Sequence, residues 1–124
     1  MDSGLGGWMG RYIAAWDSND SAAIAGLFTD DAEYRYYPWA VAARGTDEIV
    51  ERWLSSADEP GDHRFSWQEI GTDGDRHFVQ GRTVYADGRT YENLWIIDLD
   101  PDRRARAFTE WYMESASKQL GPNG

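Results

Sequence analysis

The sequence predicts a single α+β domain in which three helices pack on a curved, mostly antiparallel sheet that encloses a pocket. In the first half of the chain, apolar residues recur at steps of three and four, which is the period of a helix. In the second half, four strand-like runs are joined by "TDGD", "ADG" and "DPD", which are too short for crossover helices and favour antiparallel pairing. Residues 1–124 are enough for one hydrophobic core and too few for two.

Three helices are expected, at residues 5–16, 21–28 and 45–54. The first has one apolar stripe, made of Leu5, Trp8, Met9, Tyr12, Ile13 and Trp16. The second helix, "SAAIAGLF", follows Asn19 and Asp20, and either of these residues is a suitable N-cap. The third helix, "GTDEIVERWL", can be capped by Thr46, and its acidic first turn suits the positive end of the helix dipole.

Five strands are expected after or between these helices. The segment "EYRYYP" predicts a brief strand that Pro38 ends. Four longer strands are predicted at residues 63–71, 76–85, 89–99 and 104–113. A twisted sheet under only three helices leaves space that side chains do not fill, and we expect the pocket there. Residues 115–124 are expected to form a loose tail.

Composition argues against several classes of function. The net charge of −10 repels phosphate backbones and anionic membranes, so neither a nucleic acid nor a membrane is an expected partner. No cysteine is present, and two histidines, His63 and His77, make a poor metal site without a third ligand. We therefore expect no metal and a surface pair of histidines. No apolar run has membrane-spanning length and no signal-peptide pattern is seen, so the default expectation is a cytoplasmic protein.

The order of the elements, with the residues that fill it, resembles the NTF2-like superfamily and, within it, the SnoaL-like proteins. The likeness rests on "RYIAAWDSNDSAAIAGLFTDDAEY", "RGTDEIVERWL" and "FTEWYM", and it extends from about residue 8 to residue 114. It implies a cone-shaped fold more specifically than an activity. The superfamily includes isomerases, dehydratases, polyketide cyclases, epoxide hydrolases and members with no known catalysis, so the site must be argued separately.

Ketosteroid isomerases of this fold supply a first template. They use a tyrosine on the first helix and a protonated carboxylic acid to stabilise an oxyanion, with a second carboxylate as the base. Tyr12 matches the tyrosine, but the base falls at Tyr36 and the carboxylic acid near Trp95. Both carboxylates are therefore missing, and this chemistry is not expected in its usual form.

Limonene-type epoxide hydrolases supply a second template. They use a water-activating carboxylate on the last strand, which Glu110 matches, and Tyr34 and Arg82 match two of its partners. The template's asparagine is replaced by Tyr36 and its acid partner by Val84. Water activation would survive these changes, but protonation of an epoxide oxygen would need another donor.

SnoaL-like polyketide cyclases supply a third template, which this sequence contradicts least. They rely largely on one carboxyl group near the end of the sheet, where this chain has Glu110. Their intramolecular aldol closure removes a proton next to a carbonyl and returns one to oxygen, and a single carboxyl group of suitable pKa can do both. Phe108 and Tyr112 lie two residues to either side of Glu110 and would desolvate it.

The direction of the Glu110 side chain is open between two interpretations. Alternation divides the last strand into one face with Arg106, Phe108, Glu110 and Tyr112 and another with Ala107, Thr109, Trp111 and Met113. The second face is more apolar, so the pattern alone favours an exposed Glu110. The resemblance implies the reverse, with Glu110 on the concave face and the other face in a homodimer. Arg82 shares a strand face with Phe78 and Val84, so it is expected to point inward, where it would form a structural or catalytic ion pair with Glu110.

These interpretations combine into one expected function. The chain would be a cofactor-independent enzyme of isomerase, cyclase or lyase type that performs general acid/base chemistry on a small apolar or polycyclic carbonyl substrate. Glu110 would transfer the proton, Tyr34 and Tyr12 would donate hydrogen bonds, and Arg82 would tune Glu110. The expected substrate-binding residues are Trp16, Tyr36, Trp39, Trp53, Trp95, Phe108 and Tyr112. The alternatives are a non-catalytic ligand-binding or dimerisation module and an epoxide-hydrolase-like enzyme with an altered acid.

Overall fold

The computed structural model describes residues 4–59 and 61–115 of the chain. This part of the chain contains three helices and six strands. The helices are α1 (Leu5–Ser18), α2 (Ser21–Ala25) and α3 (Gly45–Ser55). The strands are β1 (Phe28–Arg35), β2 (Ala43–Arg44), β3 (His63–Asp73), β4 (Arg76–Tyr85), β5 (Thr90–Leu99) and β6 (Ala105–Glu114). The tail expected at residues 115–124 lies outside the described residues, apart from Ser115.

Local sequence explains where each helix begins and ends. The buried stripe of α1 runs to Ala15, and the helix ends where Asn19 adopts a left-handed conformation with φ of 56°. Asp20 caps α2, as predicted, because its Oδ2 accepts a hydrogen bond of 2.9 Å from the backbone N–H of Ala23. The helix is shorter than predicted, since it ends at Gly26 and the chain then enters β1.

The predicted cap of α3 is wrong. Thr46 lies inside the helix, and the N-cap position belongs to Arg44. Gly45 opens the helix with φ of 81°, a left-handed conformation that favours glycine. The side chain of Glu48 reaches back and accepts a hydrogen bond of 2.9 Å from the backbone N–H of Arg44. A carboxylate therefore satisfies the first N–H of this turn from within the helix.

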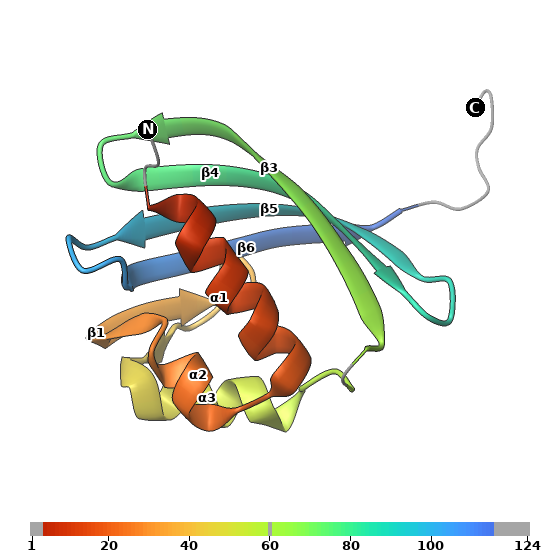
Figure 1. The fold of residues 1–124 in the computed structure, drawn as a ribbon, viewed down its shortest axis with the longest axis horizontal. Helices are drawn as coiled ribbons and strands as arrows, with labels where there is room; N and C mark the ends of the chain where they lie inside the picture. Colours follow the sequence, from red (N-terminus) through yellow and green to blue (C-terminus); the bar gives the residue numbers. More distant parts are fainter. Residues whose placement is uncertain (1–3, 60, 116–124) are drawn as a thin grey trace.

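One six-stranded sheet, in the order β2-β1-β6-β5-β4-β3, carries the fold. The four long strands β3 to β6 form the predicted antiparallel meander, and β1 joins it by pairing in parallel with β6. Register shifts interrupt the ladders between Glu69 and Gly71 and between Asp98 and Leu99. Such irregularities increase strand twist and bending, which suits the curvature of this sheet. Figure 1 shows the curved sheet with α1 lying across its concave side and α2 and α3 beyond the end of α1.

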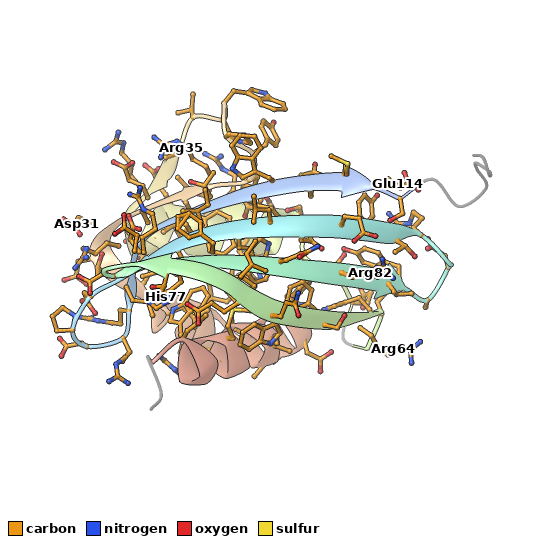
Figure 2. The ribbon with its side chains drawn as sticks, turned by 90° about the horizontal axis from the view of Figure 1, so that it is seen from above. Asp31, Arg35, Arg64, His77, Arg82 and Glu114 are labelled. Atoms are coloured by element: carbon orange, nitrogen blue, oxygen red, sulfur yellow. The ribbon has the colours of Figure 1, made fainter. Side chains whose placement is uncertain are left out.

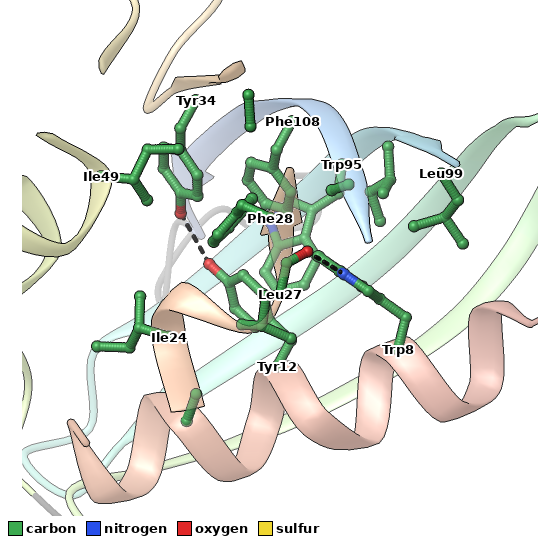
Figure 3. Close-up of a cluster of buried hydrophobic side chains, with 14 of the residues drawn as sticks. Trp8, Tyr12, Ile24, Leu27, Phe28, Tyr34, Ile49, Trp95, Leu99 and Phe108 are labelled. Carbon is green, nitrogen blue, oxygen red and sulfur yellow. Dashed lines mark hydrogen bonds between the residues drawn. The ribbon is translucent and has the colours of Figure 1, made fainter. Parts of the chain in front are cut away.

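The core lies between α1 and the concave face of the sheet. Trp8 is fully buried at its centre, and its indole N–H donates a hydrogen bond of 2.9 Å to the backbone oxygen of Leu27. Phe28 and Phe108 pack against the same indole ring at centroid distances of 6.3 and 6.2 Å. Figure 3 shows these side chains converging from helix and sheet. The prediction of an α+β fold with helices on a curved sheet is thus confirmed.

Within residues 4–59 and 61–115, none of the helices has both the length and the apolar character needed to cross a bilayer.

Candidate active site

A cavity of about 300 Å³ opens between the concave face of the sheet, α1 and the end of α3. Its volume falls at the small end of the usual range for ligand pockets, which is roughly 300–1,000 Å³. Nine of its sixteen lining residues are aromatic: Tyr12, Trp16, Tyr34, Tyr36, Trp53, Tyr85, Tyr91, Trp95 and Tyr112. The others are Ser56, Ala57, Asp58, Thr83, Arg89, Asn93 and Glu110. The cavity therefore combines aromatic walls with a comparable share of polar and charged groups.

Glu110 enters this cavity from the middle of β6. Its cross-strand partner on β5 is Trp95, and both side chains line the same space. The Glu110 side chain keeps some contact with the cavity, yet protein atoms surround it on nearly every side. This burial raises its pKa from an ordinary value of 4.5 to about 7, and Trp95 and Asn93 offset part of the rise. Trp95 lowers this pKa because its indole lies close to the carboxyl group. Within the described residues, its buried Nε1 makes no hydrogen bond of good geometry.

Asn93 holds the carboxyl group of Glu110 directly. Its Nδ2 donates a hydrogen bond of 2.6 Å to Oε2 of Glu110, and its Oδ1 accepts one of 2.9 Å from Thr83. Asn93 and Thr83 are both buried. Sequence analysis did not assign either residue to the site. Alternation along β5 could have indicated Asn93, because Asn93, Trp95 and Ile97 are the buried inner positions of this strand.

Two tyrosine hydroxyl groups belong to the same cavity as this carboxyl group. Tyr12 from α1 and Tyr34 from β1 are hydrogen-bonded to each other at 2.7 Å, as the dashed line in Figure 3 shows. Burial raises the pKa of both hydroxyl groups well above their ordinary value, and the charge of Glu110 contributes to the rise. Tyr36, two residues along from Tyr34, has a pKa raised to about 12, again mainly by burial. All three hydroxyl groups are therefore neutral donors at physiological pH.

A second carboxyl group, from Asp58 in the loop after α3, lines another part of the cavity. Its Oδ2 accepts hydrogen bonds of 2.9 Å from Nε1 of Trp16 and 3.0 Å from the hydroxyl group of Tyr85. Neither Asp58 nor Tyr85 is among the residues predicted for the site. Asp58 lies in a loop, where no periodicity indicates the direction of a side chain, and Tyr85 is the last residue of β4. Their contacts tie the loop after α3 to α1 and to the end of β4.

The structure brings together most of the residues predicted for the site. Glu110, Tyr34 and Tyr12 meet in the cavity, along with Trp16, Tyr36, Trp53, Trp95 and Tyr112. Phe108 does not line the cavity. Instead it is fully buried beneath it, where its ring stacks on Tyr34 at a centroid distance of 4.6 Å.

Arg82 does not lie in the cavity, contrary to prediction. Its Nε pairs with Oε2 of Glu92 at 3.1 Å, on the exposed face of the sheet. Figure 2 labels it toward one end of β4, with His77 toward the other end. The prediction failed because Phe78 and Val84, the apolar residues used to orient the strand, share the outer face with Arg82, while Val79 and Thr83 are buried on the inner face.

Trp39 is a second correction. It is 80% exposed, in the loop between β1 and β2, and its ring packs on Tyr37 at a centroid distance of 4.8 Å. The expectation that it binds substrate relied on its aromatic character alone. Pro38 follows β1, so the strand alternation that directs Tyr34 inward does not extend to Trp39.

The two histidines do not form the expected surface pair. His77 is buried on the inner face of β4, with its Nδ1 2.8 Å from Oε2 of Glu69. His63 stacks on Trp16 at a centroid distance of 4.0 Å, and burial lowers its pKa. Among the described residues, no cluster of three or more histidine, aspartate or glutamate side chains has the arrangement of a metal site.

Comparison with known proteins places the chain in a family. The SnoaL-like domain family matches residues 9–105. The comparison with curated proteins gave no match. Among solved structures, the chain is similar to an NTF2-like protein of unknown function from Mesorhizobium loti, with 20% identity, a TM-score of 0.67 and coverage of 89% of this chain and 91% of that one.

Two isomerase-like structures share the same architecture. One is a putative ketosteroid isomerase from Kribbella flavida, with 15% identity, a TM-score of 0.68 and coverage of 93% of this chain and 82% of that one. The other is a steroid delta-isomerase from Pseudomonas aeruginosa, with 14% identity, a TM-score of 0.64 and coverage of 91% and 82%. At these low sequence identities, the structural likeness establishes the shared fold alone. By its family match and its architecture, the chain belongs to the SnoaL-like domain family within the NTF2-like fold.

Proposed function

We propose that this protein is a cofactor-independent enzyme of isomerase, cyclase or lyase type that acts on a small, largely apolar carbonyl compound. The observation that carries the proposal is the position of Glu110, which lines an aromatic cavity together with Tyr12 and Tyr34 and is close enough for its charge to raise the pKa of both hydroxyl groups. A carboxyl group with a pKa of about 7 is present in both protonation states near neutral pH, as a proton shuttle requires. The small cavity and its aromatic walls favour a compact, apolar substrate.

In the proposed reaction, ionised Glu110 removes a proton from the carbon next to the substrate carbonyl. The carbon–hydrogen bond breaks, its electron pair moves toward the carbonyl oxygen, and the proton forms a new bond to a carboxyl oxygen of Glu110. The resulting enolate oxygen accepts a hydrogen bond from the tyrosine pair. The protonated Glu110 then returns its proton to another carbon or to oxygen, so the enzyme ends in its starting state.

The tyrosine pair suits this role because it retains one free hydrogen. Of the two hydroxyl hydrogens, one is used in the bond of 2.7 Å between Tyr12 and Tyr34, and the other remains available to a ligand. A preorganised donor of this kind stabilises developing negative charge without reorganising during the reaction. The raised pKa of both groups keeps them protonated while they donate.

Epoxide hydrolysis is a weaker proposal. The template that suggested it relies on an arginine that orients an acid, and Arg82 pairs with Glu92 on the opposite face of the sheet. A non-catalytic ligand-binding module remains the main rival, since an aromatic cavity serves binding equally well. The rival differs in its prediction for Glu110, because a binding protein does not need the carboxyl group to exchange protons.

The test is the exchange of solvent deuterium into small cyclic ketones, followed by proton NMR. We expect the wild-type protein to accelerate loss of the signal of hydrogens next to the carbonyl, and Glu110→Gln to reduce the rate by roughly 10² to 10⁴. Glu114→Gln is the matched control, because Glu114 is an exposed carboxylate on the same strand. Equal rates for wild type and Glu110→Gln would refute the proposal, as would ligand binding without exchange.

A further inference from the structure

Three side chains from neighbouring strands form a continuous hydrogen-bonded chain on the concave face of the sheet. Thr83 on β4 donates to Oδ1 of Asn93 on β5 at 2.9 Å, and Nδ2 of Asn93 donates to Oε2 of Glu110 on β6 at 2.6 Å. Thr83 is 2% exposed and Asn93 is 7% exposed. Both therefore depend on protein partners, and the chain ends at the carboxyl group of Glu110.

The chemistry of the three groups fixes the direction of every bond. An ionised carboxylate can only accept, so the amide nitrogen of Asn93 must face Glu110 and its carbonyl oxygen must face Thr83. Thr83 can donate to that oxygen, whereas a reversed amide would set its carbonyl oxygen against the carboxylate. The ionised carboxylate thus sets the orientation of the amide, and the hydrogen bond from Thr83 to Oδ1 helps to hold the amide in place.

The same bond distinguishes the two oxygens of Glu110. When Glu110 is protonated, its carbonyl oxygen accepts a hydrogen bond better than its hydroxyl oxygen does. Oε2 is therefore the carbonyl oxygen, and the proton belongs on Oε1. The bond from Asn93 also resists rotation of the carboxyl group, which would otherwise exchange the two oxygens.

We propose that Asn93, oriented by Thr83, is a positioning residue that holds Oε2 of Glu110 and leaves Oε1 as the oxygen that exchanges protons with the substrate. The inference rests on the proposed function of Glu110. It adds how residues of the neighbouring strands orient the Glu110 carboxyl group. It also accounts for polar residues at two adjacent inner positions of a largely aromatic cavity.

Other groups close to Glu110 keep a constant charge over the useful pH range. Tyr12, Tyr34 and Tyr36 all have raised pKa values and stay neutral below pH 9. Trp95 does not titrate, and its indole lowers the pKa of Glu110. Asp58 lines another part of the cavity, where Trp16 and Tyr85 occupy its Oδ2. A change in the titration of Glu110 can therefore be traced to the hydrogen bond that a variant removes.

The test replaces each link of the chain and measures two properties. Asn93→Leu removes the donor to Oε2 and keeps a side chain of similar size. We expect the pKa of Glu110, followed by carboxyl-carbon NMR, to rise by about one unit, because a hydrogen bond to the ionised form is lost. We expect kcat for ketone exchange to fall roughly tenfold or more, with a smaller change in KM, because the variant disturbs the orientation of the Glu110 carboxyl group and leaves substrate binding largely intact.

Thr83 gives a second test if Asn93→Leu does not fold. Thr83→Val is isosteric and removes the hydrogen bond that holds Oδ1 of Asn93, so the pKa of Glu110 should rise and kcat should fall, each less than in Asn93→Leu. Thr83→Ser keeps the hydroxyl group and should restore both values. The matched control is Gln80→Leu, which removes an amide from the exposed face of the same strand as Thr83 and should change neither.

The outcomes separate this inference from the proposed function. An unchanged Glu110 pKa and kcat in Asn93→Leu and Thr83→Val, with Glu110→Gln inactive, would overturn the positioning role and leave the enzyme proposal standing. A shifted Glu110 pKa in both variants, with no exchange even by the wild type, would support the positioning of Glu110 by Asn93 and Thr83. It would refute the enzyme proposal. If Thr83→Ser fails to restore the Glu110 pKa and the kcat that Thr83→Val changes, this would also count against the positioning role of the hydrogen-bonded chain.

Discussion

At the scale of single residues, Glu110 carries a free-energy cost that depends on pH. Its pKa is about 7 in the folded protein and 4.5 is its ordinary value, so between these pH values the folded state binds more protons than the unfolded state. The stability of the fold therefore falls as pH rises through this window and is lower, but constant, above it. A shift of this size corresponds to about 3 kcal/mol.

Glu110→Gln should remove this dependence because an amide does not ionise. We expect the variant to be more stable than the wild type by about 3 kcal/mol at pH 8 and of similar stability at pH 4.5. Urea unfolding at the two pH values measures the difference. Glu114→Gln, at an exposed position of the same strand, should show no comparable gain. A wild type that gains stability relative to Glu110→Gln between pH 5 and 8 would contradict a raised pKa.

Single residues are also where sequence interpretation was least reliable. The composition of β6 favoured an exposed Glu110, and only the resemblance to a fold placed it inward. The prediction for Arg82 is wrong because its apolar neighbours do not mark the buried face, since both faces of β4 carry apolar residues. The prediction for Trp39 is wrong because aromatic character alone does not place a loop residue in a cavity. Asn93 could be placed only once Trp95 and Ile97 were known to be buried. Side-chain direction depends on which face the helices cover, which no local pattern encodes.

At the scale of elements, the sequence was far more informative. The strand Arg76–Tyr85 was predicted with its observed bounds, and the long helices and other long strands to within a few residues, because apolar period and turn residues mark them directly. The two-residue strand Ala43–Arg44 was missed because it is too short to show a period. The parallel pairing of β1 with β6 was also beyond local signals, since it joins segments far apart in the chain.

Asp20 provides a test of the local signals that hold α2. The side chain accepts the only side-chain cap bond described for this helix, 2.9 Å from the N–H of Ala23. Asp20→Ala should lower the free energy of unfolding by about 1 kcal/mol, measured by urea denaturation, whereas Asp20→Asn keeps a capping oxygen and should lose much less. Equal losses for both variants would show that the carboxylate charge, and not the cap bond, matters.

At the scale of the whole molecule, the outer face of the sheet is the surface that we expect to form a homodimer. Trp111 is 47% exposed and Met113 is 69% exposed on the face of β6 that points away from the cavity. Their cross-strand partners are Leu94 and Glu92. Exposed apolar residues in such a group are typical of an interaction surface.

Trp111→Glu should convert a dimer into a monomer, because it adds a charge to an apolar interface of a chain whose net charge is already −10. Sedimentation velocity at micromolar concentration measures the change. Leu54→Glu is the matched control, since Leu54 is 41% exposed on α3 and should leave the dimer intact. A wild-type protein that sediments as a monomer at these concentrations would rule out the interface.

The most direct test of the central claim is a titration of the Glu110 carboxyl carbon by NMR, with Glu110→Gln used to assign the signal. The account predicts a pKa of about 7, which corresponds to a carboxyl group that burial desolvates and that is available as both acid and base near neutral pH. A value near the ordinary 4.5 would show that water solvates the carboxyl group, and it would contradict the role of Glu110 as a proton shuttle.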